Sequence, residues 1–166
     1  VGVENTPNHN QSFLSCMADL YAKERNLEKT PKLEEFRNTV VAALSLDVFV
    51  QLQNGTLVSQ FSDKKVKMDD VSIDGYKDQK LYQNLDKREE SQLSFLKHCI
   101  VSYELFCSYL RQPDAKLDHM LLWDVVTRPL LFAKGLNLAI FEIMQDDMTN
   151  KVNLVCPTSH FHPPLY

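Results

Sequence analysis

The feature that most constrains the fold is a long run of apolar residues at helical spacing between Asp86 and Pro113. Successive members of this run are separated by three or four residues, which is the repeat of one face of an α-helix. The members are Leu93, Leu96, Ile100, Tyr103, Cys107 and Leu110. Further apolar residues lie between them, as expected for a helix that is covered on several sides. We therefore predict a central helix that Asp86 caps and that ends before Pro113. The run spans fewer than three heptads, which favours burial in the core over a coiled coil.

The residues before this helix predict several shorter helices. Apolar spacing indicates helices over residues 12–25, 31–44, 46–53 and 56–61. Thr30 and Pro31 are suited to start the second of these helices, and Asn54-Gly55 is suited to end the third. From residue 63 to residue 90, charged side chains interrupt every apolar period. We predict a solvated region there, in which residues 81–85 form a short strand or a docking segment.

The last part of the chain predicts one short helix and a β-hairpin. Asp118 is expected to cap a helix over residues 119–127. Residues 136–144 and 151–156 are short β-rich runs joined by a polar turn, which is typical of paired strands. The first run is apolar on both faces, so we expect it in the middle of a sheet. The predicted fold class is therefore α+β, with helices around a small, mostly antiparallel sheet that forms late in the chain.

Length and composition indicate one domain over residues 1–166. A chain of 166 residues that is 44% hydrophobic is large enough for one core. The formal net charge of -4 argues against a broad basic surface that would bind nucleic acid. No run of the sequence approaches the ~20 consecutive apolar residues that span a bilayer. The four cysteines lack paired spacing, which favours reduced thiols and an intracellular protein. We expect a monomer that binds neither nucleic acid nor membrane. Because the chain starts without methionine, we also expect it to be a domain of a larger protein.

A polar segment runs directly into the apolar pattern of the first helix. Ser12 occupies an N-cap or first-turn position there, and Cys16 lies one helical turn later. A hydroxyl or thiol near the positive end of a helix dipole is stabilised when it ionises, so both side chains are candidate nucleophiles. The alternative interpretation is that Ser12 only caps the helix and that Cys16 packs as a small apolar side chain.

Two histidines that follow the second predicted strand are candidates for the other half of a hydrolase site. His160 and His162 are alternate residues, so they face the same way if the chain stays extended after Pro157. A nucleophilic hydrolase needs a general base and a polar group that orients it. Asp124, in the predicted short helix, is a second candidate for the orienting group.

The order of these elements resembles the ovarian-tumour (OTU) family of papain-like deubiquitinases. In that family a loop of the type Asp-Gly-Asn-Cys precedes the first helix. Here His9, Asn10 and Gln11 would overlay the loop that forms the oxyanion hole, and Ser12 would take the position of the cysteine. The glycine of the family loop is absent.

The closing strand of the same family carries the catalytic histidine, which an Asn or Asp follows two residues later. The segment His160-Phe161-His162 would overlay this motif, with His160 as general base and His162 in the orienting position. The resemblance implies hydrolysis of isopeptide bonds to ubiquitin or a ubiquitin-like protein, with no cofactor. Serine in place of the cysteine implies an inactive domain, natural or engineered, unless Cys16 is the nucleophile. An inactive domain would bind ubiquitin or a viral partner without cleaving it.

Metal and nucleotide sites are not expected. Cys156, His160 and His162 are of metal-ligand type, but zinc requires a fourth ligand and usually a closely spaced pair. The chain has four glycines and no glycine-rich phosphate loop.

Residues 121–124, 136–140 and 153–161 are also similar to segments of large proteins from nucleocytoplasmic large DNA viruses, iridoviruses among them. This similarity implies a viral protein that acts in the host-cell cytoplasm. The alternative to a hydrolase is a non-enzymatic interaction or structural module of such a protein, in which Trp123 and the central helix serve packing alone.

Overall fold

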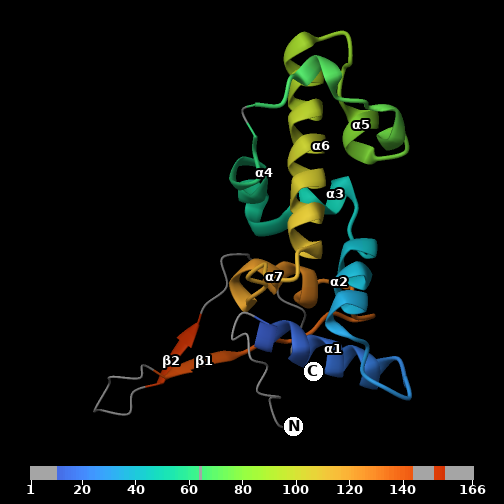
Figure 1. The fold of residues 1–166 in the computed structure, drawn as a ribbon. Helices are drawn as coiled ribbons and strands as arrows, with labels where there is room; N and C mark the ends of the chain where they lie inside the picture. Colours follow the sequence, from blue (N-terminus) through green and yellow to red (C-terminus); the bar gives the residue numbers. More distant parts are fainter. Residues whose placement is uncertain (1–10, 64, 144–151, 156–166) are drawn as a thin grey trace.

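The computed structural model of the chain describes residues 11–63, 65–143 and 152–155. Helix α6, Glu90–Arg111, is the axis of the helical part, and the other helices are arranged along it (Figure 1). Leu96, Ile100, Phe106 and Leu110 of α6 are fully buried. The predicted central helix is therefore confirmed.

The start of α6 differs from the prediction. Its N-cap residue is Glu89, and Asp86 lies before the helix. There the Asp86 carboxylate accepts a hydrogen bond from the backbone N–H of Arg88 at 2.9 Å. This bond to the residue two positions later forms a local turn, which competes with helix capping. The prediction that Asp86 caps the central helix is wrong for this reason.

The N-terminal part forms four short helices and one 3-10 turn. They are α1 (Ser12–Glu24), α2 (Leu33–Ala42), α3 (Leu46–Phe49), η2 (Leu52–Gly55) and α4 (Thr56–Gln60). Helix α2 begins two residues later than predicted, where the Glu35 carboxylate accepts a hydrogen bond from the backbone N–H of Lys32 at 3.2 Å. The helix predicted over 46–53 is shorter: α3 ends at Phe49, and left-handed backbone conformations follow from Gln53.

Aromatic rings fill the contacts between these helices. Helices α2, α3 and α4 pack against α6, and α1 packs against α2. Phe106 of α6 contacts Phe49 and Phe61, with ring centroids 5.3 and 5.0 Å apart. Tyr21 of α1 contacts Phe36 of α2 at 5.6 Å. Tilted and edge-to-face ring pairs of this kind add to the stabilisation that burial of apolar surface provides.

The charged region between α4 and α6 is solvated, as predicted, and contains only short elements. They are η3 (Met68–Asp70), η4 (Asp74–Tyr76) and α5 (Lys80–Asn84). Of the two alternatives for residues 81–85, the strand is therefore wrong, because the segment is helical; Leu81, Tyr82 and Leu85 pack against the core. The amino end of α5 is held by Asp47 of α3, whose carboxylate accepts hydrogen bonds from the backbone N–H groups of Lys80 and Leu81, both at 2.8 Å. A carboxylate that bonds two unpaired N–H groups stabilises a helix start.

The C-terminal part forms one helix and one hairpin. Helix α7 (His119–Thr127) starts as predicted, because the Asp118 carboxylate accepts a hydrogen bond from the backbone N–H of Leu121 at 3.0 Å. Strands β1 (Ile140–Ile143) and β2 (Val152–Val155) pair in antiparallel fashion, with Phe141 opposite Leu154. The hairpin extends from the side of the helical part (Figure 1).

The fold class is α+β, with a small antiparallel sheet late in the chain, as predicted. In the described residues this sheet has two strands, so β1 is an edge strand. The expectation that the first strand lies in the middle of a sheet is therefore wrong for the described residues, in which β1 pairs with β2 alone and Phe141 is exposed. No helix in the described ranges has both the length and the apolarity that a bilayer crossing requires.

Candidate functional site

The two candidate nucleophiles lie near the amino end of α1. Ser12 is the first residue of this helix, and Cys16 lies one turn later; both are half-buried. The N-cap residue is Gln11, whose side chain makes no capping hydrogen bond to the helix. Cys16 is a free thiol that packs against the core. Ser12 therefore occupies the position at which the helix dipole would stabilise an anion most strongly.

The Gln11 side chain connects the amino end of α1 to the residues that follow α6. This side chain is buried, and its Nε2 donates hydrogen bonds to the carbonyl oxygens of Pro113 at 3.0 Å and Ala115 at 3.1 Å. Its Oε1 accepts a hydrogen bond from Nη2 of Arg37. The donors and the acceptor of this amide are thus used inside the fold. Any contribution of Gln11 to an oxyanion hole would have to come from its backbone N–H.

Arg37 is a buried charged residue that no sequence pattern indicates. It is 3% exposed, and its Nη1 donates hydrogen bonds to the carbonyl oxygens of Leu110 at 3.3 Å and Gln112 at 2.6 Å. Its Nη2 donates to the carbonyl oxygen of Pro113 at 3.0 Å. Burial lowers the pKa of the guanidinium, and the nearby carboxylate of Asp114 acts in the opposite direction. Arg37 therefore satisfies carbonyl groups at the C-terminal end of α6, which have no partner inside the helix.

Asp124, a candidate orienting group, is buried in α7 and takes part in a different contact. Its Oδ2 accepts a hydrogen bond from the backbone N–H of Gln53 at 2.7 Å and lies 3.8 Å from Nη2 of Arg128. Its Oδ1 has no hydrogen-bond partner among the described residues. The described contacts of Asp124 thus connect α7 to the turn η2.

The other predicted site residues lie outside the described residues. These are His9, Asn10, His160 and His162, together with the metal-ligand candidate Cys156. The structure therefore places Gln11, Ser12 and Cys16 together at the amino end of α1, and the pairing of these residues with His160 and His162 stays a prediction. His119 of α7 also contacts α1, with its ring centroid 6.2 Å from that of Phe13 in an edge-to-face arrangement. In the ranges that the structure describes, no three His, Cys, Asp or Glu side chains lie close enough together to hold a metal ion.

The hairpin carries an exposed apolar face, which we call the hairpin face and define as Phe141, Val152 and Leu154. These side chains are 67%, 52% and 59% exposed, the highest values among the large apolar side chains of the described residues. Phe141 lies opposite Leu154, and Val152 shares their side of the sheet because alternate residues of a strand face the same way. Contiguous exposed apolar side chains mark interaction surfaces in many proteins.

Comparisons with protein-family models, curated proteins and solved structures found no match to this chain.

Proposed function

We propose that this domain is a protein-binding module that docks ubiquitin or a ubiquitin-like protein on the hairpin face. The observation that carries this proposal is the exposure of Phe141, Val152 and Leu154 on one side of a two-stranded sheet. A hairpin of two strands is only marginally stable in water, and it gains stability when its apolar side is covered. The nature of the partner is supported by the resemblance to the OTU family.

The hairpin face would supply part of the binding energy. Covering the exposed portions of three such side chains contributes about 3 kcal/mol before the cost of association. A Kd on the order of 10 µM requires about 7 kcal/mol, so further contacts are needed. Within the part of the chain that the structure describes, β1 and β2 pair only with each other, so their outer edges offer backbone N–H and C=O groups that can pair with an extended segment of a partner. Apolar contact and backbone pairing together would account for binding of moderate affinity.

Isothermal titration calorimetry of the full 166-residue chain with ubiquitin tests this function. We expect saturable binding with a Kd on the order of 10 µM. The double variant Phe141→Ser, Leu154→Ser should weaken binding by at least about tenfold, which corresponds to about 1.4 kcal/mol. Phe95→Ser is the matched control, because Phe95 is 49% exposed on α6, outside the hairpin face. Absence of binding by the native chain, or an equal loss in the control, would contradict the proposal.

Isopeptide hydrolysis is the second candidate function, and the position of Ser12 as the first residue of α1 favours it. Ubiquitin that carries a C-terminal electrophile tests this alternative. If the native chain is labelled and the Cys16→Ser variant is not, an active thiol at Cys16 is supported. Labelling that appears only in the Ser12→Cys variant would support a site that serine has silenced. If neither protein is labelled, the hydrolase function is excluded and the binding function is unaffected.

A further inference from the structure

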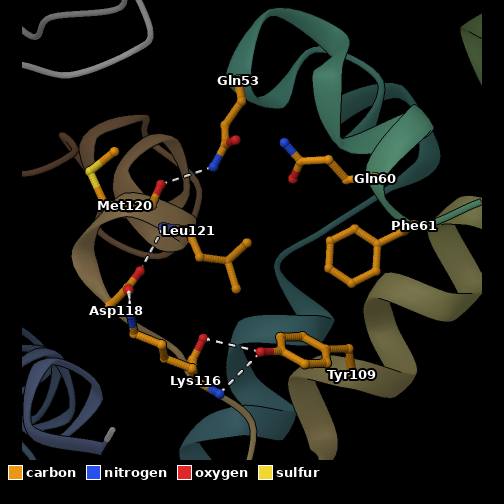
Figure 2. Close-up of a pocket in the computed structure, with 8 residues that line it drawn as sticks. All are labelled: Gln53, Gln60, Phe61, Tyr109, Lys116, Asp118, Met120 and Leu121. Atoms are coloured by element: carbon orange, nitrogen blue, oxygen red, sulfur yellow. Dashed lines mark hydrogen bonds and ion pairs between the residues drawn. The ribbon is translucent and has the colours of Figure 1, made fainter.

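A pocket of about 440 Å³ lies between η2, α4, α7 and the last turns of α6. Its lining comes from Gln53, Gln60, Phe61, Tyr109, Met120 and Leu121, with Lys116 and Asp118 beside them. Figure 2 shows the Gln60 amide, the Phe61 ring and the Leu121 side chain pointing toward the same central space. A volume of this size is within the range of pockets that hold small ligands or single side chains. None of the lining residues belongs to the hairpin, so this site is distinct from the hairpin face.

An unusual backbone conformation places Gln53 in this pocket. Gln53, Asn54 and Gly55 have φ values of +48°, +56° and +84°, three successive left-handed residues. Only glycine adopts this conformation without strain. The turn persists because Asp124 accepts a hydrogen bond from the Gln53 backbone N–H, and because Gln53 Nε2 donates to the carbonyl oxygen of Met120 at 2.9 Å. The side chain of Gln53 is thereby fixed at one side of the pocket, next to Met120, as Figure 2 shows.

The charged groups at the pocket are already paired. Lys116 Nζ lies 3.1 Å from a carboxylate oxygen of Asp118, and the other Asp118 oxygen accepts the hydrogen bond from Leu121 N–H. The hydroxyl of Tyr109 accepts a hydrogen bond from the backbone N–H of Lys116 at 3.1 Å and donates to its carbonyl oxygen at 3.4 Å. These bonds fix one wall of the pocket and leave no unpaired charge on it for an ionic ligand.

The polar groups that stay available are neutral amides. Figure 2 shows no hydrogen bond between the exposed Gln60 amide and another lining residue, whereas Gln53 Nε2 donates to the carbonyl oxygen of Met120 and leaves Oε1 as the acceptor of that amide. An amide side chain offers a donor and an acceptor side by side, which complements the N–H and C=O groups of a peptide unit. Phe61 and Leu121 supply an apolar surface between these amides and Tyr109. A sugar would require polar partners on several sides, and an anion would require an unpaired cation.

We propose that this pocket binds an uncharged peptide segment that inserts one large apolar side chain. The apolar side chain would lie against Phe61 and Leu121. The adjacent peptide group would exchange hydrogen bonds with the amides of Gln53 and Gln60. The site thus gives the domain a second contact for a peptide partner, separate from the hairpin face.

The probe for this proposal is N-acetyl-L-phenylalanine amide, which carries two peptide groups and one apolar ring. Titrated into the ¹⁵N-labelled chain, it should shift the side-chain amide signals of Gln53 and Gln60 in a saturable manner, with a Kd on the order of 1 mM. Gln60→Ala should weaken binding at least about fivefold, the effect of one lost hydrogen bond. Gln83→Ala is the matched control, because Gln83 is an exposed glutamine on α5 away from the pocket lining.

Two results would overturn the proposal. The first is the absence of saturable shifts at Gln53 and Gln60 with the capped amino acid. The second is saturable binding of N-acetylglucosamine or adenosine at the same signals without binding of the peptide probe, which would assign the pocket to another ligand class. Both readouts are independent of ubiquitin binding at the hairpin face.

Discussion

The carboxylate of Asp124 accepts a hydrogen bond from the backbone N–H of Gln53 at 2.7 Å, although the two residues are 71 positions apart in the sequence. Gln53 is held in a left-handed conformation that costs a non-glycine residue about 1 kcal/mol or more. The buried carboxylate offsets this cost, since a hydrogen bond to an ionised group is among the stronger ones in proteins. Asp124 therefore helps to keep η2 and α7 together, beside the hydrogen bond from Gln53 Nε2 to the Met120 carbonyl.

Replacement of Asp124 by alanine should destabilise the fold by about 3 kcal/mol. The loss has two causes: the Gln53 N–H loses its acceptor, and the carboxylate beside Arg128 is removed. Urea unfolding followed by circular dichroism measures this difference. Asp78→Ala, at an exposed position, should change the unfolding free energy by less than about 0.5 kcal/mol. Equal effects of the two substitutions would show that Asp124 does not anchor the turn.

Arg37→Met should lower the unfolding free energy by about 2 kcal/mol, because buried carbonyl groups at the end of α6 lose their donor. Gln11→Ala should cost less, and the two effects should be coupled by about 1 kcal/mol, since the side chains bond each other. A double-mutant cycle measured by urea unfolding gives this coupling. Arg25→Met, at an exposed arginine, is the control. Additive effects of the Arg37 and Gln11 substitutions would contradict the network.

Gly135 lies so close to the carbonyl of Thr127 that a Cβ atom would be 2.0 Å from its oxygen, and its φ is +72°. Gly135→Ala is therefore expected to cost about 3 kcal/mol, from left-handed strain and overlap together. Gly75→Ala is the matched control, because no atom lies within 4 Å of a Cβ there and its φ is not in the left-handed range. Thermal unfolding compares the two variants. A similar melting temperature for both would show that the chain after α7 takes another path.

Asp118 should stabilise the fold in a pH-dependent manner. Burial raises the pKa of its carboxyl, but the hydrogen bond from Leu121 and the ammonium of Lys116 outweigh burial, so the pKa lies below its ordinary value. A lowered pKa in the folded state means that the contribution is present above the unfolded pKa and is lost as pH falls through the folded pKa. Asp118→Ala should therefore cost about 1 kcal/mol at pH 7 and progressively less below pH of about 4.

Urea unfolding of the native chain and of Asp118→Ala across this pH range measures the effect. Asp118→Asn keeps an acceptor for the Leu121 N–H and should lose less than half as much at pH 7. A cost of Asp118→Ala that stays constant down to the lowest pH would contradict a charged cap.

The elements with long apolar repeats were predictable from the sequence. For α1 and α6, burial of one face decides the conformation, and the repeat records that burial directly. The Asp118 cap was predictable as well, because a cap depends on residues only three positions apart. Residues 81–85 show the limit of such patterns: a short stretch with ambiguous spacing becomes helix α5 because Asp47, far away in the sequence, binds its amino end.

The contacts that hold the helices together were not predictable from local patterns. Gln11, Arg37 and Asp124 find their partners across 26 to 104 positions, and no local pattern encodes which carbonyl or N–H will be nearby. For the candidate site, the sequence predicted the helix that carries Ser12 and Cys16, and it predicted the hairpin. It did not predict that the apolar side of the hairpin is exposed, since apolar residues ordinarily indicate burial.

Hydrogen–deuterium exchange of the chain, with and without saturating ubiquitin, tests most directly whether a partner docks on the hairpin. We predict that ubiquitin slows exchange of the backbone amides in residues 140–143 and 152–155, while those of α1 are unchanged. Protection of residues 12–24 without any change in the hairpin would contradict this account and would place the contact at the amino end of α1.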